Sequence, residues 1–538
     1  MKIFGKIIDI HSRSIFDAEM SIEKGIITAI APSDKSYERF ILPGLIDAHV
    51  HIESSMVTPS SFAVEAVKHG TVAVVSDPHE IANVCGIRGI DFMIENSLSV
   101  PMKFYFGAPS CVPATVFETN GASIDEKEIE KLLNRSEIHY LCEVMNYPGV
   151  INNDGSVIKK IALAKEAGKP IDGHAPELSG DTLKKYINAG ITTDHECMSY
   201  EEAEEKILCG MKILIREGSA ARNLDNLKEL YQKYPDKLML CSDDLHPEML
   251  VKGHINRLVG KLISEGYNVF DVVRSATVNP AVHYSMNLGL LRVGDKADFI
   301  IVDSLEKMNV FETWIDGVRV FENGKVNFSA SSVVELNNFN SSKISISDIK
   351  VLTRGAKVKV IEVFDGELFT KNLIIPVWKT PELCSDTEKD ILKIVVKERY
   401  NDSPLTVGFI KGFGLNCGAF ASSIAHDSHN IICVGVSDND IVNAINTVVD
   451  MRGGLAVCNE DKISKHRLEI GGIMTSTSCC ETAENYLKLN NQINEMGCCL
   501  KAPFMTLSFM ALLVIPELKI GDKGLFDVNA FSITELFE

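Results

Sequence analysis

Side chains that can bind a metal ion recur directly after apolar, strand-like runs in the first half of the chain. His49 and His51 follow the run that begins at Leu45. Alternate residues of an extended segment point to one side, so both imidazoles can face one cation. A single histidine or acid in such a place is usually structural, whereas repetition at several strand ends indicates a metal centre. The other side chains of this set are Glu143, His174, His195 and Asp243.

These six side chains outnumber the ligands of one catalytic ion, since a catalytic zinc site usually has three protein ligands and a water molecule. Two divalent ions are therefore the simplest interpretation. Glu143 can bridge them, because a carboxylate can offer one oxygen to each ion. Four imidazoles and two carboxylates without a thiolate suit manganese, iron or zinc, and the order of metal affinities does not decide between them.

The elements that must position these residues alternate between strand-like and helix-like runs from residue 41 to residue 285. Eight strands with intervening helices over this length predict an α/β fold of the (β/α)8 barrel type, in which the active site lies at the carboxyl ends of the strands. The predicted strands are Leu45 to Asp47, Val72 to Val75, Lys103 to Phe106, Tyr140 to Cys142, Pro170 to Asp172, Thr192 to Asp194, Lys212 to Ile215 and Leu238 to Cys241.

The sequences on either side of the barrel have a different texture. Residues 1–40 and 286–328 contain short strands and hairpin turns such as Asp316-Gly317, which predict one small β-sandwich domain built from both pieces. Residues 329–538 again combine strands with helical runs and predict a separate C-terminal α/β domain.

The composition limits the class of protein and its partners. The 538 residues hold 54 Lys and Arg against 73 Asp and Glu, a formal charge of −19. This charge repels phosphate backbones and anionic lipid, which argues against nucleic acid or a membrane as partner and allows a small neutral substrate. The first residues do not resemble a signal peptide, and the longest apolar run, Phe504 to Ile515, is too short for a membrane helix. Together with 14 Cys that show no C-x-x-C spacing, this predicts a cytoplasmic protein with reduced thiols.

The run from Leu42 to His51, with the later His, His and Asp, resembles the amidohydrolase superfamily. Further segments resemble the bacterial adenine deaminase family over essentially the whole chain. Many amidohydrolases bridge their metals with a carboxylated Lys after the fourth strand, whereas here that strand ends in Cys142 and Glu143, the variant that an adenine deaminase would show. The matching segments are Ser76 to Val84, Gly173 to Pro176, Ser242 to Pro247, Ser423 to Ile432 and Pro503 to Phe509.

The resemblance implies hydrolytic deamination of adenine to hypoxanthine and ammonia, in purine salvage, by a metal-activated bridging hydroxide. It also implies a homodimer or a higher homo-oligomer, with adenine and water as the small-molecule partners. We expect two divalent ions per chain, manganese first, with iron or zinc as alternatives.

Our mechanistic hypothesis assigns His49, His51 and Asp243 to one ion, His174 and His195 to the other, and Glu143 to both. Asp243 is the expected general acid and base, because it lies where it can take the proton of the attacking water and pass it on.

Two acids past the second strand are expected to act on the substrate. Asp77 and Glu80 are predicted to bind ring N–H groups or to protonate a ring nitrogen. The structural alternative is a polar loop in which Asp77, ahead of Pro78, shapes a turn. Three further groups, expected to support the site or to face the substrate, are Ser54, Asp244 and His246.

Two other functions stay open at this point. A cyclic amidohydrolase, such as a dihydroorotase-like enzyme, would use the same metal ligands on another small ring. A noncatalytic scaffold would keep a structural metal, but it predicts the loss of at least one ligand, and all six are present. In the last domain, His426 and His429 lack an accompanying set of ligands in the sequence, which favours a turn or an interface.

Overall fold

The computed structural model describes residues 1–219 and 221–538, and the chain divides into two compact units. The barrel unit comprises residues 1–79, 91–111 and 124–333. The C-terminal unit comprises residues 80–90, 112–123 and 334–538. Two short segments from the first quarter of the sequence therefore belong to the C-terminal unit.

Eight parallel strands form the centre of the barrel unit and confirm the predicted fold class. Strands β5 to β9 are hydrogen-bonded in order, as are β10 to β12. The N–H of Thr192 donates to the carbonyl of Ile171 at 2.9 Å, and a bridge between Val50 and Asp243 joins the last strand to the first. The strands are β5 Leu45–Val50, β6 Thr71–Ser76, β7 Lys103–Ala108, β8 Ile138–Val144, β9 Ile171–Gly173, β10 Thr193–Asp194, β11 Lys212–Arg216 and β12 Leu238–Cys241.

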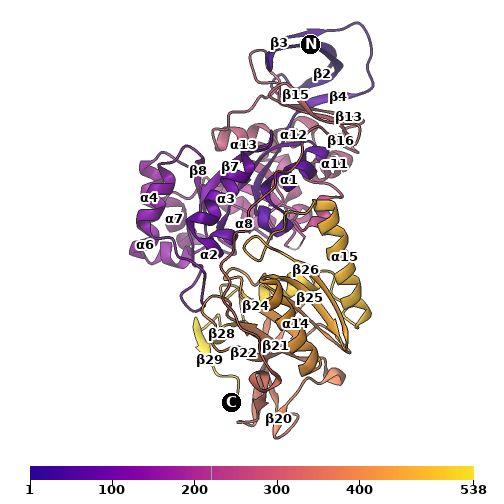
Figure 1. Cartoon of the computed structure of the whole chain (residues 1–538). Helices are drawn as coiled ribbons and strands as arrows, with labels where there is room; N and C mark the ends of the chain where they lie inside the picture. Colours follow the sequence, from indigo (N-terminus) through magenta and orange to yellow (C-terminus); the bar gives the residue numbers. More distant parts are fainter. Residues whose placement is uncertain (220) are drawn as a thin grey trace. The chain divides into compact units, whose positions relative to one another are not determined.

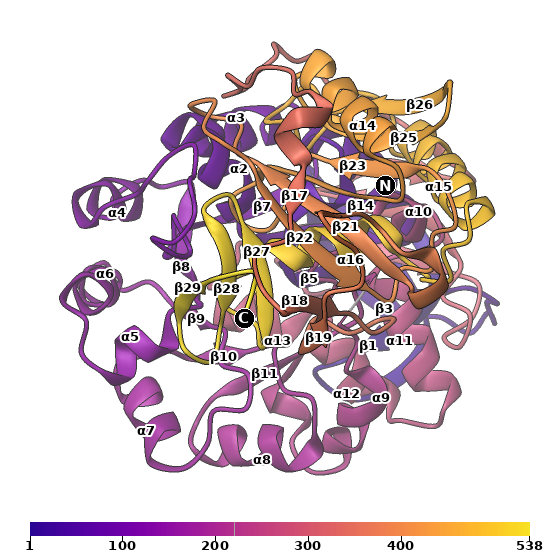
Figure 2. The same ribbon diagram turned by 90° about the horizontal axis from the view of Figure 1, so that it is seen from below.

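These strands are buried on both faces because helices cover the outside of the barrel. Every residue of β5 and β6 is buried, which is why β6 reads as an apolar run rather than an alternating one, and why the polar Asp47 and His49 of β5 lie in the interior. Figure 2 shows α7, α8 and α12 on the outer side of β9, β10 and β11. The covering helices include α4 Glu126–Leu133, α6 Gly155–Glu166, α7 Gly180–Asn188, α8 Tyr200–Leu208, α11 Ile255–Ser264 and α12 Val269–Ser275.

The two pieces that flank the barrel in sequence, predicted to form a small β-sandwich, join in one eight-stranded sheet with the order β16-β15-β14-β13-β4-β1-β2-β3. Its core includes Phe299 stacked on Trp314. Gly44 carries the chain from this sheet into the barrel, where a Cβ would lie 2.3 Å from the Val72 side chain. The strands are β1 Lys2–Asp9, β2 Ser14–Glu23, β3 Ile26–Pro32, β4 Phe40–Pro43, β13 Phe299–Val302, β14 Val310–Ile315, β15 Val318–Glu322 and β16 Lys325–Val326.

The C-terminal unit is built on a second eight-stranded sheet, in the order β19-β18-β22-β21-β24-β23-β25-β26. Helix α14, Asp438–Met451, packs on β23, β24 and β25 and buries Ile441, Ile445 and Val448 at helical spacing (Figure 1). None of the described helices is long and apolar enough to cross a membrane. The strands are β18 Lys357–Glu362, β19 Lys371–Pro376, β21 Ile391–Lys397, β22 Thr406–Lys411, β23 Ala419–Ser422, β24 Ile431–Gly435, β25 Gly454–Asn459 and β26 Lys462–Arg467.

Candidate metal centre

The six side chains that the sequence analysis singles out as metal ligands lie together in the barrel unit, at the carboxyl ends of its strands. Five of them are at most 5% exposed, and His174 is half-buried. Each strand delivers its ligand at its last residues or just beyond them, which is where the barrel topology brings the chain to one rim. The five buried side chains are His49, His51, Glu143, His195 and Asp243.

Glu143, near the end of β8, lies between two sets of imidazoles. Its Oε1 is 3.3 Å from Nε2 of His51. Its Oε2 is 3.3 Å from Nε2 of His195 and 2.8 Å from Nδ1 of His174. Because each oxygen faces different imidazoles, the carboxylate has the arrangement that a bridge between two ions requires.

Asp243, directly after β12, divides its two oxygens in a similar way. Its Oδ1 is 3.4 Å from Nε2 of His49 and 3.3 Å from Nε2 of His51. Its Oδ2 accepts a hydrogen bond from Nη1 of Arg216 at 2.8 Å. The backbone N–H of Asp243 donates to the carbonyl of His49 at 2.9 Å, which ties this turn to the end of β5.

The donor set and its spacing fit divalent ions. Two ligand atoms at about 2.0–2.2 Å from one ion, at the tetrahedral angle, lie about 3.4 Å apart. The imidazoles of His49, His51 and His195 stand at this distance from a carboxylate oxygen. Both ring nitrogens of His49 are buried without a hydrogen-bond partner among the described residues, which a bound cation would remedy.

The predicted ligands form one continuous cluster. His49 and His51 both face Oδ1 of Asp243, as the hypothesis expects, and the ring of His49 also stacks on that of His195 with centroids 4.4 Å apart. His51 lies between Glu143 and Asp243. The division of the six side chains between two ions stays a prediction.

The carboxylates and imidazoles of the cluster shift one another's pKa values. Burial raises the pKa of Glu143, but contacts with His174, His195 and His51 bring it well below its usual range. Burial lowers the pKa of His51 and of His195, and their carboxylate partners raise both well above the usual range.

Two further residues in contact with this cluster escape the sequence analysis, although they lie at strand ends like the predicted ligands. Glu196 directly follows His195, and its Oε1 is 3.2 Å from Nε2 of that imidazole. Arg216 is the last residue of β11 and donates to both oxygens of Glu196, at 2.5 and 2.9 Å, as well as to Asp243. Such an arginine, 3% exposed, holds two carboxylates of the cluster in fixed orientations.

Behind the ligands, Asp47 ties β5 to the end of β12. Its Oδ1 accepts from the N–H of Ser242 at 3.0 Å, and its Oδ2 contacts the Ser242 hydroxyl and Nε2 of His254, the latter at 2.7 Å. Nδ1 of His254 lies 2.7 Å from the hydroxyl of Thr71 on β6. This buried network fixes the backbone on either side of His49 and Asp243.

The predicted substrate-side residues take two kinds of place. Asp77 is buried in the barrel unit, where its Oδ1 accepts from the N–H of His79 at 3.0 Å, as the turn interpretation expects. The hydroxyl of Ser54 donates to Asp244 at 2.5 Å. His246 precedes the short helix α10, Pro247–Leu250, and its N–H donates to the Ser219 hydroxyl at 2.9 Å.

Glu80 follows His79 in the chain but packs in the C-terminal unit. Its Oε1 accepts from Nδ1 of His426 at 2.8 Å, and its Oε2 contacts Nε2 of His429. The sequence analysis finds no partner for these two histidines, because Glu80 is 346 residues away from His426 along the chain.

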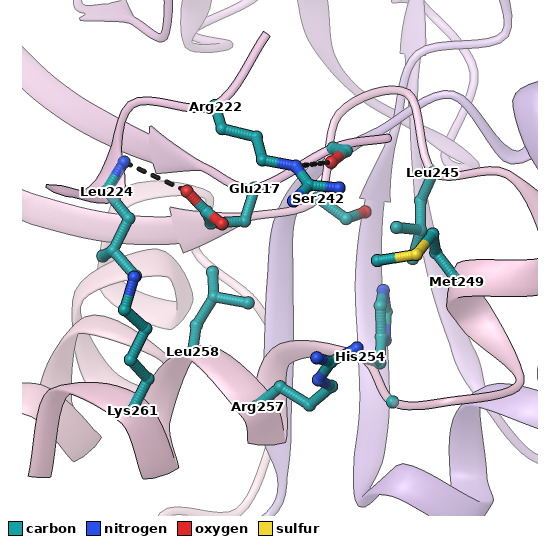
Figure 3. Close-up of a pocket in the computed structure, with 12 residues that line it drawn as sticks. Glu217, Arg222, Leu224, Ser242, Leu245, Met249, His254, Arg257, Leu258 and Lys261 are labelled. Atoms are coloured by element: carbon teal, nitrogen blue, oxygen red, sulfur yellow. Dashed lines mark hydrogen bonds between the residues drawn. The ribbon is translucent and has the colours of Figure 1, made fainter. Parts of the chain in front are cut away.

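A cavity of about 150 Å³ lies beside this region of the barrel unit, among the loops after β11 and β12 and helix α11 (Figure 3). Arg257 and Lys261 border it from α11, and Leu245 and Met249 from the opposite side. The lining residues that the structure describes include none of the six predicted ligands. It therefore marks space behind Ser242 and His254 rather than the metal cluster itself.

The chain is similar in sequence to known protein families and to individual relatives. Residues 40–320 match the model of the amidohydrolase family, and residues 367–532 match that of the adenine deaminase C-terminal domain. The chain is 52% identical to the adenine deaminase of Methanosarcina mazei, over 100% of this chain and 99% of that protein. It is also 52% identical to the adenine deaminase of Methanosarcina barkeri, over 99% and 98% of the two chains, and 51% identical to that of Sulfurovum sp., over 99% and 98%.

Proposed function

We propose that this chain, which belongs to the adenine deaminases of the amidohydrolase family, hydrolyses adenine to hypoxanthine and ammonia. The observation that carries this function is the likeness to curated adenine deaminases at about half of all positions over the full length of the chain. The matched region includes both the barrel and the C-terminal domain, so the likeness is not limited to the barrel.

The residues proposed to hold two divalent ions are His49, His51, His174, His195, Glu143 and Asp243. Bound there, the ions would lower the pKa of a water molecule enough for it to attack carbon at neutral pH. Manganese is our first choice, with iron or zinc as alternatives, because the donor set contains nitrogen and oxygen only. Glu143 is the proposed bridge, since its two oxygens face different imidazoles.

Asp243 is the proposed general acid and base. It takes a proton from the attacking water and delivers it toward the purine, so that the amino group can leave as ammonia. The hydrogen bond from Arg216 holds Oδ2, which leaves Oδ1 directed at the imidazole cluster.

The purine itself is assigned to the residues past β5, β6 and β12. Asp77 and Glu80 are proposed to bind or protonate ring nitrogens, because both follow the end of β6 within four residues. Ser54, Asp244 and His246 support this side of the site through the contacts described above. We also propose that the protein is a cytoplasmic homo-oligomer that acts in purine salvage. Its proposed domains are residues 1–40 with 286–328, residues 41–285 and residues 329–538.

One preparation tests the central claim. Metal content and ammonia release are measured together on the manganese-loaded enzyme, with adenine set against guanine, cytosine, adenosine and dihydroorotate. Two ions per chain with ammonia release from adenine alone is the expected result. Turnover of dihydroorotate without deamination of adenine would replace the proposal with a cyclic amidohydrolase, and two bound ions with no turnover of any compound would leave a scaffold.

A further inference from the structure

The C-terminal unit holds a buried glutamate between two histidines, apart from the six predicted ligands. Glu80 is 3% exposed, His426 6% and His429 1%. Nδ1 of His426 donates to one carboxylate oxygen at 2.8 Å, and Nε2 of His429 contacts the other. Each oxygen of Glu80 therefore has an imidazole of its own.

Both histidines are themselves held in place. They lie in the connection between β23 and β24, two paired strands of the central sheet. The ring of His426 stacks on Phe509 with centroids 4.7 Å apart, and the N–H of His429 donates to the carbonyl of Ala425 at 2.6 Å. The two imidazoles therefore hold the Glu80 side chain in place. Glu80 loses its conformational freedom when the protein folds and not again when a substrate binds.

The pair formed by Glu80 and His426 has hydrogen-bond geometry, at 2.8 Å. The same distance separates His174 from Glu143 in the barrel unit, so a short hydrogen bond and metal-ligand spacing occur together in one cluster. Glu80, His426 and His429 also form a group with metal-ligand spacing, and the metal content of the variants distinguishes a bound ion from a positioned carboxylate.

We propose that His426 and His429 are positioning residues that fix the carboxylate of Glu80 for its contact with the purine. This inference rests on the proposed function, in which Glu80 acts on a ring nitrogen. Because the carboxylate is already fixed before the substrate binds, no conformational entropy is lost in ordering the carboxylate during the reaction.

A double-mutant cycle tests the proposal on the manganese-loaded enzyme. His426→Leu and His429→Leu are each made in the wild-type background and in a Glu80→Gln background, and kcat, KM and metal content are measured for adenine. We expect each leucine variant to lower kcat/KM by about tenfold or more in the wild type, as for a lost hydrogen bond to a charged group. In the Glu80→Gln background the same change should cost less than about twofold, because the group that it positions is already gone.

Two further variants separate positioning from packing. His426→Asn keeps an N–H donor near Nδ1, and His429→Gln keeps one near Nε2, so both should recover most of the lost rate. His466→Leu removes another buried imidazole of the same unit and serves as the matched control, with kcat/KM expected within about twofold of wild type.

The possible failures are distinct. Equal losses in both backgrounds, or a fall in metal content in either histidine variant, would overturn the positioning role, the latter in favour of a third metal site. Wild-type activity of Glu80→Gln by itself would instead overturn the role of Glu80 in the proposed function. Thermal unfolding shows whether each leucine variant folds. If a leucine variant does not fold, the rates of His426→Asn and His429→Gln test the positioning role instead.

Discussion

Each compact unit buries one glutamate among histidines, and the two clusters differ in the number of side chains that they gather. Glu143 in the barrel unit lies 2.8 Å from His174 and 3.3 Å from His51 and from His195, and a second carboxylate, Asp243, contacts His51. Glu80 in the C-terminal unit is hydrogen-bonded at 2.8 Å to His426 and contacts His429. Similar residue types thus surround a glutamate with three imidazoles in one unit and with two in the other.

Two buried lysines, one in each unit, differ in their partners. Lys206 of the barrel unit is fully buried and pairs with Asp194 at 3.0 Å and with Glu202 at 2.7 Å. Lys519 of the C-terminal unit is equally buried, but its hydrogen bonds go to the carbonyls of Leu368 and Phe509. Anionic partners thus offset the desolvation of Lys206, whereas neutral acceptors offset that of Lys519 less.

The strongest test of the comparison exchanges the two glutamates for glutamine. Glu143→Gln removes the anionic bridge, so we expect metal content to fall below two ions per chain and adenine turnover to fall by at least about 10³-fold. Glu80→Gln should keep both ions and lose rate only. Metal analysis beside an ammonia assay checks both variants, and full metal content in Glu143→Gln would remove the distinction between the clusters.

Asp243→Asn addresses the division of roles inside the barrel cluster. An amide keeps the shape of the side chain and one ligand oxygen but cannot accept the proton, so we expect kcat to fall by about 10²–10⁴-fold with adenine. Metal content is measured on the same sample. Full metal content with turnover near wild type would exclude Asp243 as the general acid and base.

Arg216→Met should have a smaller effect than loss of a ligand. It leaves Glu196 and Asp243 without their buried cation, so we expect kcat to fall by about 10–100-fold while most of the metal stays bound. The exposed Arg292, whose ion pair is with the nearby Asp295, gives a matched control that should keep wild-type kinetics as Arg292→Met. A variant of Arg216 with unchanged kcat would mean that the metals alone orient the two carboxylates.

The buried lysines give the smallest effects, which are on stability. Lys206→Met leaves Asp194 buried without its charge partner and should lower the free energy of unfolding by about 3–5 kcal/mol. Lys519→Met removes a buried amine and keeps the stem, so it should be neutral or stabilising near pH 7. Denaturant titration measures the free energy of unfolding of both variants. An equal loss in both would contradict the difference in charge pairing between Lys206 and Lys519.

Lys519 also predicts a dependence on pH. Burial lowers its pKa from 10.5 to about 7, so between these values the unfolded chain holds a proton that the folded chain has released. Stability should therefore rise with pH from about 7 toward 10.5, by a few kcal/mol at most, and the rise should be smaller in Lys519→Met. The midpoint of thermal unfolding across this range measures it, and parallel curves for the two proteins would refute the shift.

The predicted ligands share one property, which is that each lies in the last residues of a strand or shortly after its end. Glu143 and Asp243 could be picked out because a run such as Leu238–Cys241 is recognisable as a buried strand, and parallel strands of a barrel end at one rim. Arg216 and Glu196 occupy the same kind of position. They were missed because an arginine at a strand end is not itself a usual metal ligand, and a glutamate after a histidine has no periodic pattern of its own.

Sequence alone determined the alternation of strands and helices and the identity of the residues after each strand, because both are local properties of the chain. Only the tertiary structure decided which oxygen of Glu143 faces which imidazole, and that Asp47 reaches Ser242 and His254. It also decided that Glu80 meets His426 and His429, since contacts between residues hundreds of positions apart depend on packing. The same chemical groups can ligate a metal or bond to one another, and the folded backbone decides how many of them gather around one carboxylate.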